Sequence, residues 1–439
     1  MNRTIPLLVM AATLAAMTPA VQAADLGVLT SLDVCDATGT SGLTLSSAAN
    51  CLKISGSIYY EFSAGNYAPR LQVLPPLAIS GEPDDDQVSV IDDSGDPDWY
   101  SYVEGYLRFE AVAESDFGPA RAVIDLYGYQ EHEWIDGVES INDDAAVSMD
   151  YAYVAIGDTT VITAGLNGDS IINVEDDTPY DWLGTLNSNW IGDGVDFANA
   201  DATNNGSDYD TAGHVITVVS DFGNGLKAGI GLESLEADGS LVGFVSYGGD
   251  DVPLGGHFSF VAGDVLNGTF DDWAIHTGIT ASIEAFKASA ALALNDTGWW
   301  NALFTGQATF DIFTLAGTVD ATSEDEFGAS GSITAKLNDE VTLKLGGRWI
   351  DFDTTAADTE GAEVRARVEY AVSEALTLGG ELGYYADGSA TPNGADSIVD
   401  VLADLSWSPV GSGYTATLAG AVNSYGGYKT TFTAEKTFE

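Results

Sequence analysis

Charged side chains in this sequence form two sets that could together act on a dissolved solute. Carboxylates recur along segment 169–212, and basic residues stand at alternating positions of apolar segments elsewhere. Opposed charges across a narrow aqueous gap produce a transverse field that orients dipolar solutes, while the net sign of the lining sets ion preference. The carboxylates are Asp169, Glu175, Asp176, Asp177 and Asp181, and the basic residues are Arg108, Arg121, Lys344, Arg348, Arg365 and Arg367.

The basic residues also have a purely structural interpretation. Each arginine could pair with an acidic neighbour that shares its face, and the candidate partners are Glu104, Glu110, Glu363 and Glu369. The chain holds 14 Lys and Arg against 67 Asp and Glu, so whichever interpretation holds, we predict a preference for cations.

The residue pattern gives little indication of a catalytic site or a metal site. The four histidines lie in separate segments without a recognisable nucleophile motif, and glycine-rich phosphate loops are not found. Acidic runs at 84–86 and 324–326 lack the spacing of a calcium-binding loop, which favours a solvated acidic surface, with diffuse divalent-cation binding as the alternative. We predict no catalytic residue, no cofactor and no metal site.

The elements that would position these charges are strands. In "AEVRARVEY", residues 362–370, charged and uncharged residues alternate without error. Successive side chains of a strand point to opposite faces, so one face carries four charges and the other carries none. Such a strand suits an apolar medium on one side and water on the other.

Composition limits the alternatives. The chain has 439 residues, a net charge of −53 and 45% hydrophobic residues, including 9 Trp, 19 Tyr and 17 Phe. This aromatic content argues against intrinsic disorder outside loops. So large a negative charge excludes a nucleic-acid partner, because it would repel phosphates.

Alternating segments continue from residue 52 to the end of the sequence, separated alternately by short turns and by longer acidic connections. This rhythm is typical of an antiparallel barrel with short turns at one end and long loops at the other. The pattern permits up to about 20 strands. Aromatic residues near the predicted loop junctions would form interface girdles. They are Trp99, Tyr100, Tyr127, Tyr129, Trp273, Trp299, Trp300, Tyr384 and Tyr385.

The N-terminal part has the pattern of an exported protein. Arg3, a short apolar stretch and the small residues before position 24 predict a signal peptide over 1–23. Residues 24–51 would form a cysteine-containing periplasmic or lumenal segment, and 52–439 the barrel domain. In an oxidising compartment Cys35 and Cys51 would form a disulfide; two unpaired thiols are the alternative.

Two stretches resemble the alphaproteobacterial porin family. "CLKISGSIYYEF", with Cys35 upstream, is similar to the N-terminal loop and first strand of that family, and "MDYAYVAIGDTTVITAGLNGDS", residues 149–170, is similar to the strands leading into its third external loop. The resemblance implies a homotrimer of transmembrane antiparallel β-barrels, each narrowed by an inward-folded third loop. It implies 16 strands, with 18 or more as the alternative.

These observations predict a porin of the bacterial outer membrane. Its water-filled channel would pass ions and small hydrophilic solutes passively, with outer-membrane lipid around it. One alternative is a substrate-selective outer-membrane channel. Another, from a different class, is a secreted acidic β protein that binds calcium or carbohydrate.

Overall fold

The structure is a computed structural model, and it describes part of the chain. The described residues are 35, 42–46, 50–66, 98–135, 138–142, 147–172, 179–185, 211–248, 253–270, 272–323, 326–354, 357–387, 397–424 and 426–439. The predicted signal peptide at 1–23 and most of segment 24–49 lie outside these ranges. Among the described residues, no helix is long and apolar enough to cross a membrane.

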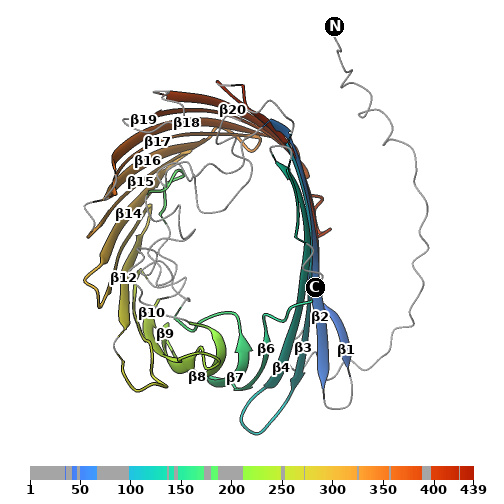
Figure 1. The fold of residues 1–439 in the computed structure, drawn as a ribbon, viewed down its shortest axis with the longest axis vertical. Coiled ribbons are helices and arrows are strands. Elements are labelled where there is room, and N and C mark those ends of the chain that lie inside the picture. The colour runs from blue at the N-terminus through green and yellow to red at the C-terminus, as the bar shows by residue number, and fades with distance from the viewer. Residues whose placement is uncertain are drawn as a thin grey trace, which may run out of the picture.

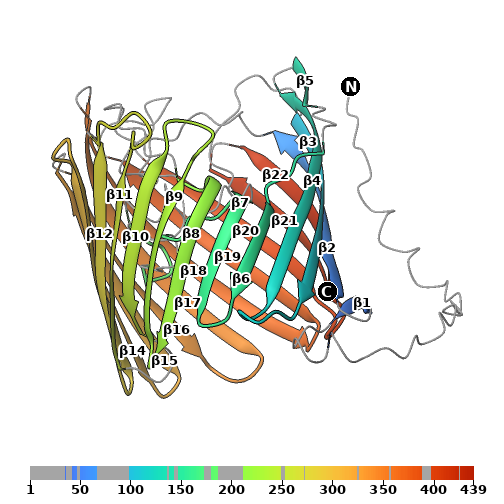
Figure 2. The ribbon, with the colours of Figure 1, turned by 90° about the horizontal axis from the view of Figure 1, so that it is seen from below.

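Within the described ranges, 20 strands form a closed antiparallel ring, and β1 (Leu43–Ser46) and β5 (Val138–Asn142) add short pairings to β2 and β4. Pairing of Gly56–Asn66 in β2 with Tyr428–Phe438 in β22 closes the ring (Figures 1 and 2). The ring strands are β2 (Cys51–Asn66), β3 (Asp98–Ala113), β4 (Ala120–Ile135), β6 (Ala152–Gly157), β7 (Thr160–Asn167), β8 (Gly213–Gly223), β9 (Leu226–Glu233), β10 (Ser240–Tyr247), β11 (Leu254–Ala262), β12 (Trp273–Ile283), β13 (Phe286–Asn295), β14 (Trp300–Phe310), β15 (Phe313–Thr322), β16 (Phe327–Lys336), β17 (Val341–Thr354), β18 (Ala357–Ser373), β19 (Leu376–Asp387), β20 (Ser397–Trp407), β21 (Tyr414–Asn423) and β22 (Tyr428–Phe438).

The expected 16 strands are therefore wrong, while the all-β antiparallel barrel is confirmed. The ring has 20 strands because closely spaced segments remain separate hairpins. For example, β10 pairs with β11 along its length, and β14 pairs with β15 across the tight turn at 311–312. The number implied by the family resemblance was too low, whereas the alternation pattern itself allowed the larger ring.

The two faces of each strand differ as the alternation predicts. In β18, Val364, Val368 and Tyr370 face outward and are about half exposed, whereas Glu363 and Arg365 face inward and are buried. Exposed apolar side chains recur outward around the ring, while most buried residues on the opposite faces are polar or charged. An apolar exterior around a polar interior is the arrangement of a transmembrane β-barrel.

The predicted aromatic girdles are only partly present. Trp273, Trp300 and Tyr384 are exposed on the outer surface, near strand ends. In contrast, Tyr127 lies inside the barrel, where its hydroxyl contacts Glu104, and Tyr385 is buried. Position parity along β3 and β4 also turns Tyr100 and Tyr129 inward, because each lies an even number of residues from an inward-facing neighbour.

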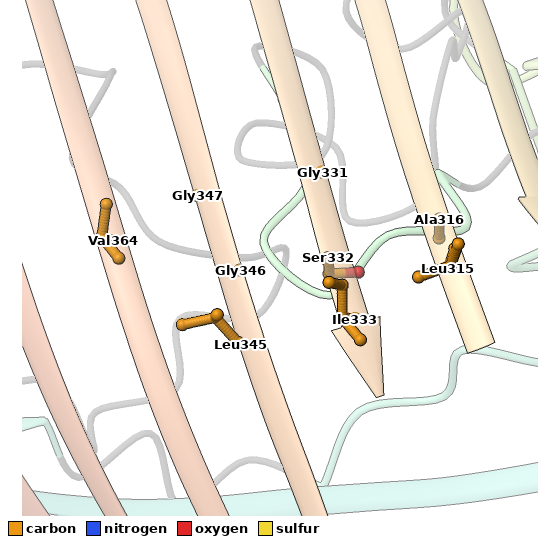
Figure 3. A pocket seen from close by; sticks show the side chains of 9 residues that line it. All are labelled: Leu315, Ala316, Gly331, Ser332, Ile333, Leu345, Gly346, Gly347 and Val364. Atoms are coloured by element: carbon orange, nitrogen blue, oxygen red, sulfur yellow. The ribbon is translucent and has the colours of Figure 1, made fainter. Parts of the chain in front are cut away.

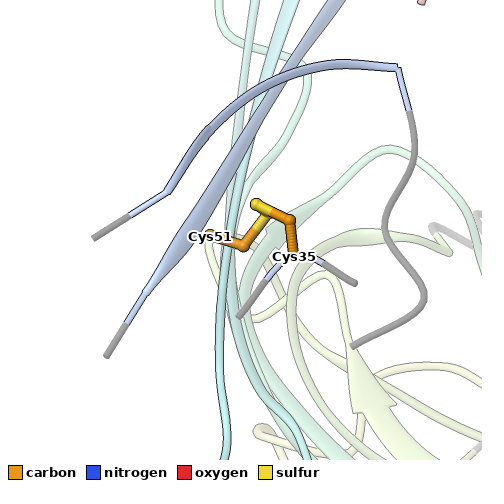
Figure 4. Close-up of a disulfide and its surroundings, with 2 residues drawn as sticks. All are labelled: Cys35 and Cys51. Carbon is orange, nitrogen blue, oxygen red and sulfur yellow. A yellow bond between two sulfur atoms is a disulfide. The ribbon is translucent and has the colours of Figure 1, made fainter. Parts of the chain in front are cut away.

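A disulfide fixes the N-terminal segment beside the closure of the ring. Cys35 and Cys51 are bonded, with an S–S distance of 2.05 Å and their Cα atoms 4.9 Å apart, which confirms the predicted pair (Figure 4). Strand β1 pairs with Cys51–Ile54, the part of β2 just beyond its pairing with β22. The N-terminal hairpin therefore continues the edge of β2 where the C-terminal strand stops.

A shallow apolar hollow of 510 Å³ lies over β15–β18 (Figure 3). Its lining includes Leu315, Ile333 and Leu345, which are exposed on the outer surface, and Gly331 and Gly347, which are paired in register. The hollow is on the side of the wall away from the charged interior.

Candidate functional site in the barrel interior

A continuous ion-pair network covers the inner faces of β17–β20. Glu363 accepts hydrogen bonds from Arg348 Nε, at 2.7 Å, and from Arg365 Nε. Arg365 also contacts Glu381 and Asp400, at 2.8 and 3.0 Å. Buried charges are tolerated when they are paired and hydrogen-bonded, and this network meets that condition for Glu363.

The network continues through a second group of charges. Glu369 pairs with Lys344 Nζ at 3.0 Å and with Arg367 Nε at 2.9 Å, and Arg367 also pairs with Asp404 at 2.9 Å. The whole network joins four basic residues to five carboxylates, which leaves one carboxylate in excess. Its members are Lys344, Arg348, Arg365, Arg367, Glu363, Glu369, Glu381, Asp400 and Asp404.

Strand register brings these charges together. Arg348 is directly opposite Glu363, and Arg365 stands in one row with Gly383 and Asp400. Gly383 is needed in this row, because a Cβ there would collide with the carboxylate of Asp400. A Cβ at Gly379 would likewise collide with Asp404. The glycines of β19 therefore let the carboxylates of β20 cross over to the arginines of β18.

Residues 179–185 lie against this inner wall. The backbone N–H groups of Tyr180 and Trp182 donate to Thr305 Oγ1 and Ser332 Oγ, at 2.8 and 3.0 Å. Arg348 Nη1 donates to the carbonyl oxygen of Leu183 at 3.1 Å. Gly346 leaves the space for this segment, since a Cβ there would approach Leu183 and Trp182 to 3.0 and 3.3 Å.

Residues 170–172 contact a different part of the wall. Ile171 and Ile172 pack with Val242, Phe244 and other buried apolar residues of β10–β12. Glu233, at the end of β9, is fully buried and accepts hydrogen bonds from the backbone N–H groups of Ile171 and Ala212, at 3.0 and 2.7 Å. The described parts of segment 169–212 are thus attached to two separate regions of the interior.

The five predicted loop carboxylates have different settings. Asp169 is exposed just after β7, the fifth strand of the ring. Asp181 is buried: Oδ1 accepts from the N–H groups of Leu183 and Gly184, and Oδ2 accepts from Ser330 Oγ at 2.7 Å. Glu175, Asp176 and Asp177 lie outside the described residues. Asp181 therefore shapes its own turn and fixes it to β16.

The remaining predicted basic residues lie on β3 and β4. Arg108 pairs with the buried Asp125 at 3.3 Å and stands 5.5 Å over the ring of Tyr151. Arg121 lies 3.9 Å from Glu110, and their side chains are 52% and 25% exposed. All six predicted basic residues thus face the interior and all have an acidic partner. The salt-bridge interpretation describes each of them, although Arg108 pairs with Asp125 instead of Glu104.

Two inward-facing tyrosines, Tyr102 and Tyr127, were missed as part of the lining. Strands β2–β4 carry Tyr59, Tyr102 and Tyr127 on their inner faces, where the hydroxyls contact Glu61 and Glu104. The signal was available in the sequence, because the phase of alternation places these tyrosines with the charged residues rather than with the apolar ones.

The closed ring, its apolar exterior and its charged interior define a transmembrane β-barrel, a class whose bacterial members lie in the outer membrane. The family described as "Porin subfamily" matches residues 30–199, which is less than half of the chain. No curated protein matches the sequence.

Several solved structures are similar to this chain over most of its length. An anion-selective porin from Comamonas acidovorans is 12% identical, with 89% of this chain and 100% of that chain covered and a TM-score of 0.36. Pseudomonas aeruginosa OccK7 (OpdD) is 9% identical, with 88% and 98% covered and a TM-score of 0.46. Pseudomonas aeruginosa OccK11 (OpdR) is 10% identical, with 88% and 96% covered and a TM-score of 0.45. At such low similarity, the solute selectivity of these proteins says nothing about the solutes of this chain.

Proposed function

We propose that this protein is an outer-membrane porin whose water-filled channel passes ions and small hydrophilic solutes by passive diffusion. The observation that carries the proposal is the closed ring with charged inner faces and apolar outer faces. Barrels of 16–18 strands already leave an aqueous channel, so a ring of 20 strands has room for one. The partial family match also favours a channel over an enzyme.

The channel prefers cations in this proposal. The chain carries a net charge of −53, and the β17–β20 network has one carboxylate more than it has basic groups. A lining with excess negative charge raises the local concentration of cations. The inward-facing arginines reduce this attraction of cations only in part, because carboxylates already neutralise their charges.

Segment 169–212 narrows the channel in this proposal. Its support is the attachment of residues 170–172 to the β9–β12 side and of residues 179–185 to the β14–β17 side. The carboxylates Asp169, Glu175, Asp176, Asp177 and Asp181 would then add negative charge near the constriction. The protomers assemble as a homotrimer in this proposal, on the strength of the family resemblance.

The testing experiment is planar-bilayer recording of the purified protein in a KCl gradient. The proposal expects stepwise openings in groups of three and a cation-selective reversal potential. A correctly folded protein that never conducts would overturn the channel. An anion-selective reversal potential would overturn the cation preference, and single steps would overturn the trimer.

A substrate-selective channel is the second candidate within the same class, and saturable block of the current by one solute would favour it. The secreted calcium- or carbohydrate-binding protein would instead be released into the medium and would require no detergent for extraction. The apolar outer surface of this barrel argues against a secreted soluble protein, because soluble proteins rarely expose contiguous apolar surfaces of this extent.

A further inference from the structure

A group of five tyrosines forms a continuous aromatic surface inside the barrel, on β2, β3 and β4. Tyr102 is at its centre: its ring centroid lies 6.1 Å from that of Tyr59, 6.2 Å from that of Tyr100 and 5.8 Å from that of Tyr129. Tyr127 extends the surface, 6.0 Å from Tyr129. We call these five residues the tyrosine patch.

Strand register places a carboxylate opposite four of the five rings, whereas Tyr127 stands opposite Tyr106. Glu104 stands directly between Tyr59 and Tyr129 in one row across the three strands. In the next row, Tyr102 stands between Glu61 and Glu131. Phenol rings and carboxylates therefore alternate on this part of the inner face.

Three of the five phenol hydroxyls lie within hydrogen-bond distance of these carboxylates. Tyr102 Oη donates to Glu104 Oε2 at 2.7 Å, and Tyr59 Oη donates to Glu61 Oε2 at 3.0 Å. Tyr127 Oη also lies within 3.4 Å of Glu104 Oε2. At these three positions the patch therefore presents mainly ring faces and carboxylate oxygens to a solute.

Basic side chains surround the patch at a distance along the strands. On the described inner faces of β2–β4, the first one toward the short turns is Arg108, which already pairs with Asp125. On the neighbouring β22, Lys429 is buried opposite Gly65, nearer the long-loop end than Glu61. The tyrosine patch itself is therefore a region of negative potential within the interior.

We propose that the tyrosine patch binds organic cations, that is, solutes that combine an ammonium group with an apolar body. Ring faces attract such cations electrostatically, and quaternary ammonium groups are weakly hydrated enough to benefit. The carboxylates add the complementary charge. A neutral sugar gains less, because it carries no positive charge for the ring faces and carboxylates to attract.

The position of the patch gives it a role in transport. Tyr100 and Tyr102 lie near the start of β3, at the long-loop end, whereas Arg108 lies further toward the short turns. A solute that enters from the long-loop side would pass the patch before it reaches Arg108. This step rests on the proposed channel function; the binding itself does not.

The first test is isothermal titration calorimetry of the purified protein in detergent, with choline, tetraethylammonium, glucose and sodium chloride as probes. The proposal expects saturable binding of the two organic cations and none of glucose. Tyr102→Leu should weaken binding about 3- to 30-fold, the range expected for loss of a cation–π contact. Glu104→Gln should weaken it as well, and Tyr102→Phe, which keeps the ring, should stay within about 3-fold.

Adjacent residues of β2 supply a matched control. Tyr59 faces the patch, whereas Tyr60 faces outward and is 37% exposed. Tyr59→Leu should weaken choline binding, and Tyr60→Leu should leave it unchanged. Equal effects of both substitutions, or affinity for glucose without affinity for choline, would overturn the proposal, as would the absence of any binding.

Bilayer recordings then separate this proposal from the channel itself. If the protein conducts, choline added on the long-loop side should block the potassium current saturably, and Tyr102→Leu should relieve that block by the same factor as in calorimetry. If the folded protein does not conduct yet binds choline through Tyr102, the channel function fails and the binding site stands. If the protein conducts but does not bind choline, the channel function stands and the binding site fails.

Discussion

Arg348 and Glu363 form a nearly solvent-free ion pair across β17 and β18, with Nε and Oε2 2.7 Å apart and both side chains 2% exposed. The same carboxylate also holds Arg365. Glu363 thus joins two strands of the barrel wall through two guanidinium groups.

Glu363→Gln should destabilise the barrel strongly. Removing one member of a buried pair leaves an uncompensated charge, which costs roughly 3–5 kcal/mol. The free energy of unfolding in detergent, measured by urea titration, checks this. Glu110→Gln is the control, because its partner Arg121 is 52% exposed, and it should change stability by less than about 1 kcal/mol. Equal losses in the two variants would contradict the prediction.

Gly346→Val should detach residues 179–185 from the wall. The valine would need the space that Leu183 and Trp182 occupy, whereas a Cβ at the neighbouring Gly347 meets only ordinary contacts. Limited proteolysis should therefore cut within 179–185 faster in Gly346→Val than in wild type, and Gly347→Val should be cut at the wild-type rate. Identical cleavage of all three proteins would show that the segment does not depend on this space.

Asp181→Ala should change the current through the channel. The substitution removes the acceptor for Leu183 N, Gly184 N and Ser330 Oγ, three bonds to a charged group that are each worth about 1.5–3 kcal/mol. Release of the segment should increase single-channel conductance and open-channel noise in bilayer recordings. Asp169→Ala, at an exposed position, should leave the noise unchanged. Wild-type conductance in Asp181→Ala would argue against an anchored constriction.

Loss of the disulfide should lower stability moderately. Cys35 and Cys51 close a loop of sequence separation 16, and a bridge of this length contributes about 3 kcal/mol in the chain-entropy estimate. The double variant Cys35→Ser with Cys51→Ser should unfold at lower urea concentration than the oxidised protein. Reductant should lower the midpoint of the wild type and leave that of the double variant unchanged; a reductant effect on both would point to another cause.

The sequence predicted which charged residues line the interior better than it predicted which of them pair. The alternation of apolar and polar residues placed Arg348, Arg365 and Arg367 on the polar face of their strands, and the structure has them there. The same alternation also turned Tyr127 inward, yet its position near a predicted loop junction suggested a girdle instead. The partner of Arg108 required the register of β3 against β4, which brings Asp125 opposite it.

Local sequence by itself determined the two-faced strands, the antiparallel barrel class and the cysteine pair, because each depends on neighbouring residues or on the only two cysteines present. Only the tertiary structure decided the number of strands, the closure of β2 on β22 and the ion-pair partners. Closure joins residues 56–66 to residues 428–438, and no local pattern records which distant edge a strand will meet. Side-chain partners follow from that register, since a shift of one residue would reverse every face.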